Sequence, residues 1–207
     1  MELDPATLAQ RDLYKLMIGC IVPRPIAWVS SQSSNGINNL APFSFFNGIG
    51  ANPPAVSIAI THTGDRPTGR KDTLSNILDL GEFVVNVVNE SVAAAMNETA
   101  TNYPADVDEF AAAGLTPTPG QTVRPPRVAE SPVSFECSLH TTVPVGEGPG
   151  SATLVVGIIK HIHINDAVIT DRGYIDVHKL QPIGRLAGNS YCYVHEVFEL
   201  VRKSLSS

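Results

Sequence analysis

Cysteine is scarce in this sequence, and the three cysteines that occur are far apart. Cys20, Cys137 and Cys192 are an odd number, and no two of them form a C-x-x-C pair. This pattern argues against a disulfide framework, a zinc site and a thioredoxin-type motif. It favours a protein of a reducing, cytoplasmic compartment.

Long apolar runs and an excess of basic residues are also missing. No stretch of 18 apolar residues occurs, so we expect no membrane span. The formal net charge of −6 disfavours a general nucleic-acid binder, and an anionic ligand would need a local basic cluster. The opening residues, MELDPATLAQ, are acidic and polar, so we expect them not to be a signal peptide.

Several catalytic motifs are absent as well. No G-x-G-x-x-G follows a strand, no Ser/His/Asp arrangement is evident, and residues 146–150 lack the Lys-Ser/Thr of a phosphate loop. His161 and His163 share one face of a predicted strand, but without a third ligand a solvent-facing pair is favoured over a metal site. His178 is favoured as a surface histidine over an acid/base group. We therefore predict no metal and no particular catalytic residue, and expect a cofactor to carry any chemistry.

The chain length and the spacing of apolar residues predict one mainly β domain, 1–207. The predicted strands cover residues 24–31, 37–46, 54–60, 82–88, 132–143, 152–164 and 190–200, and the predicted helices cover 6–18, 72–81 and 90–100. These strands do not alternate regularly with helices, which argues against a doubly wound sheet. A β-barrel with short helical additions fits better.

The stretch NLAPFSFFN, residues 39–47, combines strand-like aromatics with a proline and two asparagines. Pro42 has no N–H for a sheet ladder, so it indicates an edge strand or a bulge. Alternatively, the interruption frees backbone groups beside an aromatic wall, which would suit a flat heteroaromatic ligand. The sequence leaves both interpretations open.

A local basic cluster occurs in GDRPTGRKDT, residues 64–73. Arg66, Arg70 and Lys71 come just before a predicted helix that Asp72 or Thr73 can cap. A helix N-terminus with basic neighbours can hold a phosphate through charge-assisted bonds. A solvated loop is the other interpretation.

Four stretches, in order, resemble the flavin reductase-like family of FMN-binding split barrels, which includes flavoredoxin-type proteins. They are PRPIAWVSS (23–31), NLAPFSFFN…NPP (39–54), RKDTLSNI with GEFVVNVV (70–88) and PPRVAESPVSFECSL (125–139). A weaker fifth is LQPIGRLAGNSY (180–191). The resemblance implies a split β-barrel of Greek-key type that forms a homodimer, with FMN near the subunit interface.

The resemblance also implies which residues contact FMN. They are Ser30 and Ser31 along the flavin and its ribityl chain, Ala41, Phe43, Ser44 and Asn47 at the isoalloxazine ring, and Arg70, Lys71 and Thr73 at the phosphate. The inserted residues before the helix leave the assignment of Arg66 against Arg70 open. Near residues 48–50 the chain has fewer hydroxyl groups than the family pattern.

Three functions follow as alternatives. The first is an NAD(P)H-dependent flavin reductase or related FMN oxidoreductase, with NADH or NADPH as the electron donor. The second is a non-enzymatic FMN electron-transfer protein that serves a monooxygenase or another redox partner. The third is a barrel that binds some other anionic ligand.

Overall fold

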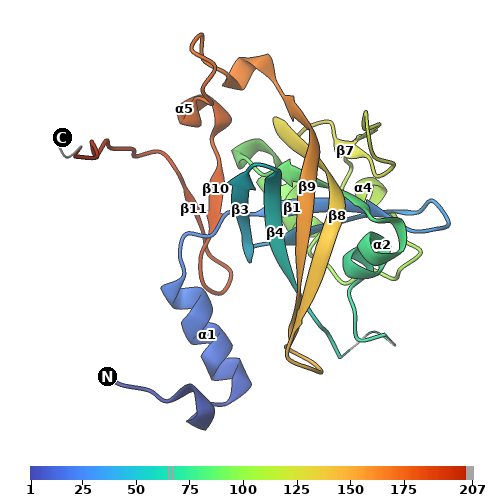
Figure 1. Cartoon of the computed structure of the whole chain (residues 1–207), viewed down its shortest axis with the longest axis vertical. Helices are drawn as coiled ribbons and strands as arrows, with labels where there is room; N and C mark the ends of the chain where they lie inside the picture. The colour runs from blue at the N-terminus through green and yellow to red at the C-terminus, as the bar shows by residue number, and fades with distance from the viewer. Residues whose placement is uncertain (65, 67, 204–207) are drawn as a thin grey trace.

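The fold is built on one antiparallel seven-stranded sheet. The computed structural model describes residues 1–64, 66 and 68–203, and in it the strands follow the order β2-β1-β5-β8-β9-β4-β3. The strands are β1 (Ala27–Gln32), β2 (Asn38–Phe43), β3 (Phe46–Ala51), β4 (Pro54–Thr61), β5 (Glu82–Val87), β8 (Val133–Val145) and β9 (Ala152–Ile164). The two edge strands, β2 and β3, are joined by only two residues, so the sheet curls back toward itself (Figure 1).

Short helices and two small strand pairs surround this sheet. The helices are α1 (Gln10–Cys20), α2 (Asp72–Leu80), α3 (Ala93–Glu98), α4 (Glu109–Ala112) and α5 (Val177–Leu180). Three 3-10 turns cover Pro5–Thr7, Glu90–Val92 and Asp166–Val168, and the small pairs are β6 (Pro117–Thr118) with β7 (Arg127–Val128) and β10 (Ile183–Arg185) with β11 (Tyr191–Tyr193).

Apolar side chains pack in two layers, one inside the curled sheet and one outside it. The inner layer includes Val29, Ile58 and Phe83, which alternate with outward-facing neighbours along their strands. The outer layer gathers around Trp28 and Leu40 and is covered by helices α3 and α4. Because β1 contributes to both layers, its residues 27–31 are buried throughout.

The sequence predicted most of these elements. The hairpin of 24–31 with 37–46 is confirmed, with Ala27 opposite Phe43 and Gln32 opposite Asn38. The strand at 37–46 is wrong in extent, because the chain bends at Ser44 and Phe45 and starts β3 at the opposite edge. The strand at 190–200 is reduced to Tyr191–Tyr193, since only these residues find a pairing partner in β10.

Helix α1 is present as predicted, but its bounds and its packing differ from the prediction. It runs from Gln10 to Cys20 instead of over 6–18, and it points away from the barrel (Figure 1). The predicted apolar face includes Leu16 and Met17, but these are 41% and 44% exposed, and only Ile18 is buried. The apolar face of α1 therefore has no partner within the described part of the chain.

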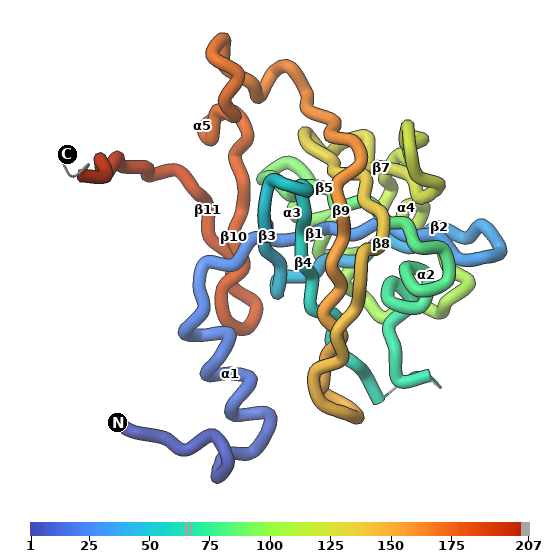
Figure 2. Tube along the Cα trace, in the orientation of Figure 1, coloured from blue at the N-terminus to red at the C-terminus, as the bar shows by residue number. Residues whose placement is uncertain are grey.

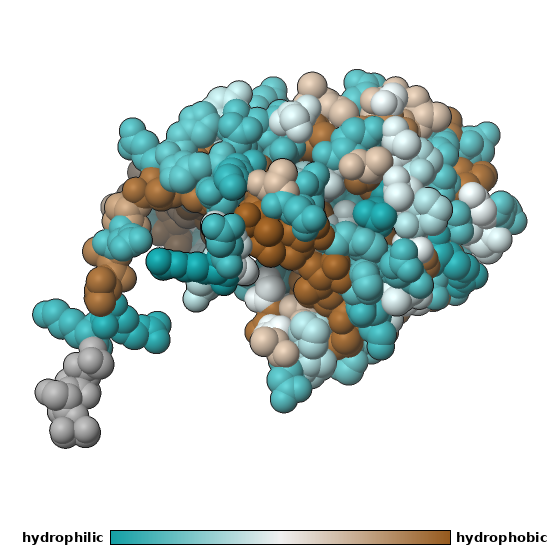
Figure 3. All heavy atoms as spheres, turned by 90° about the horizontal axis from the view of Figure 1, so that it is seen from above, coloured by the Kyte–Doolittle hydropathy of each residue, from teal (hydrophilic) through white to brown (hydrophobic). Residues whose placement is uncertain are grey.

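The C-terminal segment after β11 is extended and similarly exposed. Figure 3 shows it leaving the body of the molecule, with hydrophobic residues along it. Phe198 and Leu200 are 84% and 85% exposed. Both segments make some polar contacts, such as His195 with Glu90, but most of their large apolar side chains are exposed. For these exposed apolar side chains, we call α1 together with residues 194–203 the unpartnered ends of the chain.

No helix in the described ranges is long and apolar enough to cross a membrane. No group of three or more histidine, cysteine or acidic side chains among those residues has the geometry to hold a metal ion.

Candidate functional site

The position of β2 at the edge of the sheet explains why Pro42 is tolerated there. The Leu40 N–H donates to Glu109 Oε2 at 3.1 Å, so it points away from the neighbouring strand β1. Because N–H directions alternate along a strand, the nitrogen of Pro42 faces the same open edge. The missing N–H therefore costs no ladder bond, and the backbone carbonyls of Leu40 and Pro42 face outward beside it.

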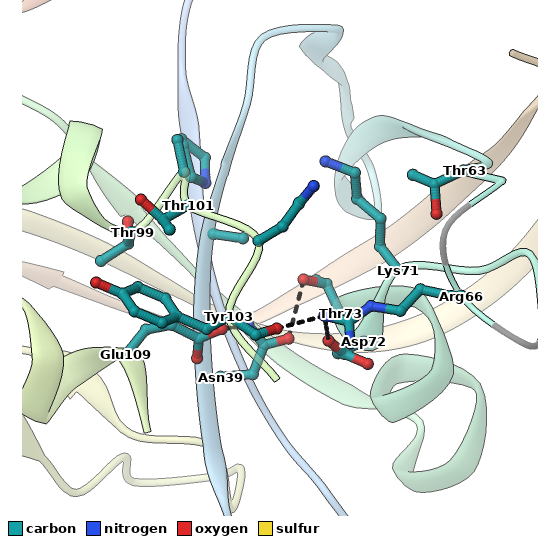
Figure 4. Close-up of a pocket in the computed structure, with 14 residues that line it drawn as sticks. Asn39, Thr63, Arg66, Lys71, Asp72, Thr73, Thr99, Thr101, Tyr103 and Glu109 are labelled. Carbon is teal, nitrogen blue, oxygen red and sulfur yellow. Dashed lines mark hydrogen bonds and ion pairs between the residues drawn. The ribbon is translucent and has the colours of Figure 1, made fainter. Parts of the chain in front are cut away.

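A hollow of about 530 Å³ lies along this open edge. Figure 4 shows it between β2, the start of α2 and the segment around Tyr103. Asn39, Ala41 and Pro42 of β2 line it. Most of its other lining side chains are polar or charged, which suits a polar or anionic ligand: Thr63, Arg66, Lys71, Asp72, Thr73, Thr99, Thr101, Asn102, Tyr103 and Glu109, with Ala100.

The basic side chains of the hollow come from the segment before α2. Arg66 Nη2 donates to Asp72 Oδ2 and to the Tyr103 carbonyl, each at 2.6 Å. Lys71 Nζ lies 5.6 Å from the ring centroid of Phe43. Lys71 is the N-cap residue of α2 and gives it no side-chain cap, so the predicted capping by Asp72 or Thr73 is wrong. The first turn of α2 therefore begins beside Lys71 without a side-chain cap from its N-cap residue.

A buried polar network supports the floor of the hollow. Asn39 Oδ1 accepts from Thr73 Oγ1 at 3.1 Å and from Ser31 Oγ at 3.4 Å. Asn39 Nδ2 in turn donates to Glu109 Oε1 at 3.2 Å. Burial raises the pKa of the Glu109 carboxyl, although hydrogen bonds from Leu40 and Asn39 oppose this, and the charge of Asp72 adds to it. These contacts hold β2, α2 and α4 in one arrangement.

A second hollow adjoins the first. The two share the lining residues Pro42 and Ala100 at the edge of β2, and we call them together the groove. Phe43, Ser44 and Tyr191 are among the residues that line the second part. The groove therefore has a polar, basic part and a part with aromatic side chains.

Comparison with known proteins identifies the kind of fold that carries this groove. The model of the flavin reductase like domain matches residues 18–178, which is most of the chain. The chain belongs to the flavin reductase-like family. The groove therefore has to be interpreted within this family, as the sequence predicted.

Solved structures agree with membership of the flavin reductase-like family. The chain is similar to nitrilotriacetate monooxygenase component B from Bacillus cereus, with 37% identity, a TM-score of 0.91 and coverage of 97% of this chain and 98% of that one. It is also similar to the 2-nitrobenzoate 2-nitroreductase NbaA of Pseudomonas fluorescens, with 32% identity, a TM-score of 0.88 and coverage of 100% and 99%.

A third structure supports the architecture alone. It comes from Shewanella frigidimarina, is described as having a split barrel domain, and matches at 23% identity with a TM-score of 0.83, covering 98% of this chain and 100% of that one. The mainly β, split-barrel prediction for this member of the flavin reductase-like family is confirmed, and the Greek-key detail stays a prediction.

The residues predicted to contact a flavin fall into three groups in the structure. Five line the groove, namely Ala41, Lys71 and Thr73 in the first hollow and Phe43 and Ser44 in the second. Ser31 lies beneath the groove and supports Asn39. Ser30, Asn47 and Arg70 do not line it: Ser30 is fully buried and donates to the Pro126 carbonyl, whereas Asn47 and Arg70 are exposed.

Other groove residues in this member of the flavin reductase-like family were not predicted. Glu109 and Thr63 approach β2 from distant parts of the chain, so no local pattern marks them. Arg66 had been left as an alternative to Arg70, and the structure brings Arg66 to the groove. Within the basic segment, Asp65 and Pro67 lie outside the described residues.

The histidine pair on β9 is only partly solvent-facing, so that prediction is wrong for one of its two members. His161 is exposed, but the His163 side chain is 18% exposed and lies 2.5 Å from Glu136 Oε1. The difference arises because residues 120–122 cover the strand there, with the N–H groups of Gln121 and Thr122 donating to Glu136.

Proposed function

We propose that the groove binds FMN and that the protein is a flavin-dependent oxidoreductase of the flavin reductase type, using NADH or NADPH as electron donor. The single observation that carries the proposal is the groove itself. It joins a basic, polar part to an aromatic part along an open strand edge. FMN has a phosphate at one end and a flat heteroaromatic ring at the other.

The basic part of the groove fits a phosphate. Thr63 lines it, and its Oγ1 is buried without a hydrogen-bond partner among the described residues. Lys71 and the positive end of the α2 dipole, where no side chain caps the helix, supply positive charge next to it. Arg66 is already held by Asp72 and adds its charge from one side. We therefore assign the phosphate to Lys71, Thr63 and the α2 N-terminus.

The remainder of the groove fits the ring and the ribityl chain. Ala41 is small and allows a flat group to approach the backbone of β2, where outward carbonyls can accept from ring N–H groups. Phe43, Ser44 and Tyr191 would surround the ring. Arg24 holds this part in place: it is buried, and its Nε donates to Ser44 Oγ at 3.2 Å while Nη2 donates to the Leu186 carbonyl at 2.9 Å.

The roles of the protein are binding, orientation and exclusion of water. Bound FMN would supply the hydride chemistry that the side chains of this chain lack. The buried network of Ser31, Asn39 and Glu109 keeps the edge of β2 rigid, which orients whatever binds there. A redox partner such as a monooxygenase belongs to this proposal, because the B. cereus relative is named as a monooxygenase component.

We also propose that two copies of the chain form a homodimer. The unpartnered ends expose Met17, Phe198 and Leu200, and so large a set of apolar side chains is unusual for a monomer. A two-fold arrangement would cover them by pairing the same surface on both copies. Tyr14 of α1 also lines the groove, so a dimer contact at α1 would lie close to the proposed ring site.

The function is tested by anaerobic mixing of the FMN-loaded protein with NADH and with NADPH. If the protein is a reductase, NADH or NADPH should reduce the bound FMN. The flavin absorbance should then disappear about as fast as the enzyme turns over in steady state. Stable yellow flavin that only a reduced protein or chemical reductant can bleach would favour an electron-transfer protein instead. A protein that binds no flavin in titration would contradict both.

The phosphate assignment is tested with Lys71→Ala. Removing one charge-assisted contact, of about 1.5–3 kcal/mol, should weaken FMN binding by roughly 10- to 150-fold. Riboflavin lacks the phosphate, so its affinity should barely change, and the FMN effect should shrink as salt rises. Arg70→Ala is the matched control, because Arg70 is exposed and outside the groove lining.

Titrations of both flavins at two ionic strengths distinguish the outcomes. Equal weakening of FMN and riboflavin in Lys71→Ala would mean that Lys71 supports the shape of the groove. A larger loss in Arg70→Ala than in Lys71→Ala would move the phosphate site away from the assigned position.

A further inference from the structure

Two buried side-chain atoms among the described residues, Thr63 Oγ1 and Arg127 Nε, have no hydrogen-bond partner, and each belongs to a residue that lines a hollow. Thr63 lines the proposed phosphate site. Arg127 lines a different hollow, at β7 and the end of β9. Buried polar atoms in folded proteins nearly always have a partner, so an acceptor for Arg127 Nε has to come from outside the described residues.

The Arg127 hollow is separate from the groove. It shares no lining residue with either of the two hollows along β2. Figure 2 shows β7 toward the upper ends of β8 and β9, whereas α2, whose start carries Lys71, lies lower in that view. A ligand at Arg127 would therefore not compete with one at Lys71.

The wall of this hollow is mixed and contains one arginine. Apolar and polar residues line it together with Arg127, and its two isoleucines are 48% and 38% exposed: Ala129, Pro132, Ile162 and Ile164 are apolar, and Ser131, His163 and Asn165 are polar. The Ser131 hydroxyl lies within hydrogen-bond distance of the Val87 and Val133 carbonyls, so its one hydrogen is already used inside the protein. The guanidinium is thus the main polar group that this hollow offers to a ligand.

The nearby acidic group does not neutralise Arg127. Glu136 is fully buried and accepts from Gln121 N–H, from Thr122 N–H and hydroxyl, and from His163. Burial alone would raise the pKa of Glu136, but these donors lower it to about 2, so the carboxylate is charged and can only accept. His163 Nε2 must therefore donate to Glu136, and its ring lies between that carboxylate and the hollow.

We propose that the Arg127 hollow is a second ligand site, which binds a small monocarboxylate with an apolar body. The planar guanidinium matches the two oxygens of a carboxylate, and Ile162 and Ile164 match the hydrocarbon part. A phosphate dianion fits less well, because the hollow offers a single arginine. The negative charge of Glu136, which contacts the lining residue His163, would also repel a dianion. Asn165, whose Oδ1 accepts from Ala167 N–H, presents amide donors at the rim.

Benzoate and benzamide are suitable probes, because they share a shape and differ in charge. We would titrate each probe into ¹⁵N-labelled protein, with and without saturating FMN, and follow the NMR resonance of the Arg127 Nε–H group. For all variants, binding of the probe would be measured by saturation-transfer NMR. Benzoate should shift the Arg127 resonance under both conditions, and benzamide at equal concentration should not. Lys71→Ala should leave benzoate affinity unchanged, which separates this site from the proposed flavin site.

Variants then test the guanidinium itself. Arg127→Gln should lower the affinity for benzoate at least about tenfold. Arg127→Lys keeps the charge but loses the planar guanidinium, so its benzoate affinity should lie between those of Arg127→Gln and the wild type. Arg124→Gln is the matched control: Arg124 is exposed and pairs with Glu82 at 3.1 Å. Its benzoate affinity should match that of the wild type.

Several results would overturn the proposal. These are equal binding of benzamide and benzoate, an unmoved Arg127 resonance, or unchanged benzoate affinity in Arg127→Gln. A shift of the Arg127 resonance on dilution of the ligand-free protein would also overturn it, because a second copy of the chain would then supply the acceptor.

Discussion

The barrel and the unpartnered ends of the chain place similar apolar side chains in opposite surroundings. Phe83 is completely buried inside the barrel, against Gly157, where a Cβ would lie 2.3 Å from the Phe83 ring. Phe198 in the C-terminal segment is 84% exposed. The barrel buries its apolar side chains within one chain, whereas α1 and residues 194–203 present exposed apolar surface, which the proposed dimer would cover.

The largest expected effect tests the barrel side of this comparison. Phe83→Ala should lower the free energy of unfolding by about 3–5 kcal/mol, because it removes a fully buried ring and leaves a cavity. Phe198→Ala is the matched change at the ends and should alter the unfolding of the isolated chain by less than about 0.5 kcal/mol. Denaturant titration at low protein concentration measures both. Similar losses of unfolding free energy in the two variants would contradict the difference between the barrel and the ends.

The next effect concerns the buried charge on the outer wall of the barrel. Glu136→Gln replaces an acceptor of four donors with a group that must itself donate, so we expect a loss of about 1.5–3 kcal/mol at neutral pH. In the wild type, the folded pKa of about 2 lies below the ordinary 4.5, so this stabilisation is present above pH 4.5 and is lost as the pH falls toward 2.

Acid titration of stability compares the two proteins directly. The difference between wild type and Glu136→Gln should shrink steadily between pH 4.5 and 2. A difference that stays constant over this window would mean that Glu136 acts through packing and not through its charge.

The smallest effect on barrel stability should come from α1, where the change acts on association. Leu16→Glu places a charge on the exposed apolar face of α1 and should reduce the mass in solution from twice the 22.0 kDa chain to one chain at micromolar concentration. Arg11→Glu places a glutamate at a polar position of the same helix, changes the charge by two units instead of one, and should still leave the mass unchanged. A wild-type protein that is already monomeric would contradict the proposed dimer.

Local patterns in the sequence were sufficient to predict elements that form from their own residues. The α2 helix ends at Gly81, which has a φ of 70°, as its glycine indicated. The hairpin of β1 and β2 was predicted from the turn at 33–36 and is present. The division between β2 and β3 was missed, because the aromatic residues continue through the bend and give the same signal on both sides.

The site was harder to predict than the fold, for a physical reason. Glu109 and Arg24 act through contacts with residues that are remote in the sequence, such as the Glu109 carboxylate with the Leu40 N–H and Arg24 Nη2 with the Leu186 carbonyl. Nothing in the neighbouring residues marks such contacts. The resemblance to the flavin reductase-like family identified β2 and Lys71, but it could not show that Ser30 is buried beneath other residues or that Arg70 lies outside the groove.

Pro42 has a consequence for how the protein behaves when it is crowded. The outer edge of β2 is a row of backbone groups on which a strand from another molecule could add, and such additions lead to aggregation. A strand that docked there would meet a position without a donor at Pro42, and the Leu40 N–H beside it is already held by Glu109. The edge therefore stays open to a small ligand and is closed to other strands.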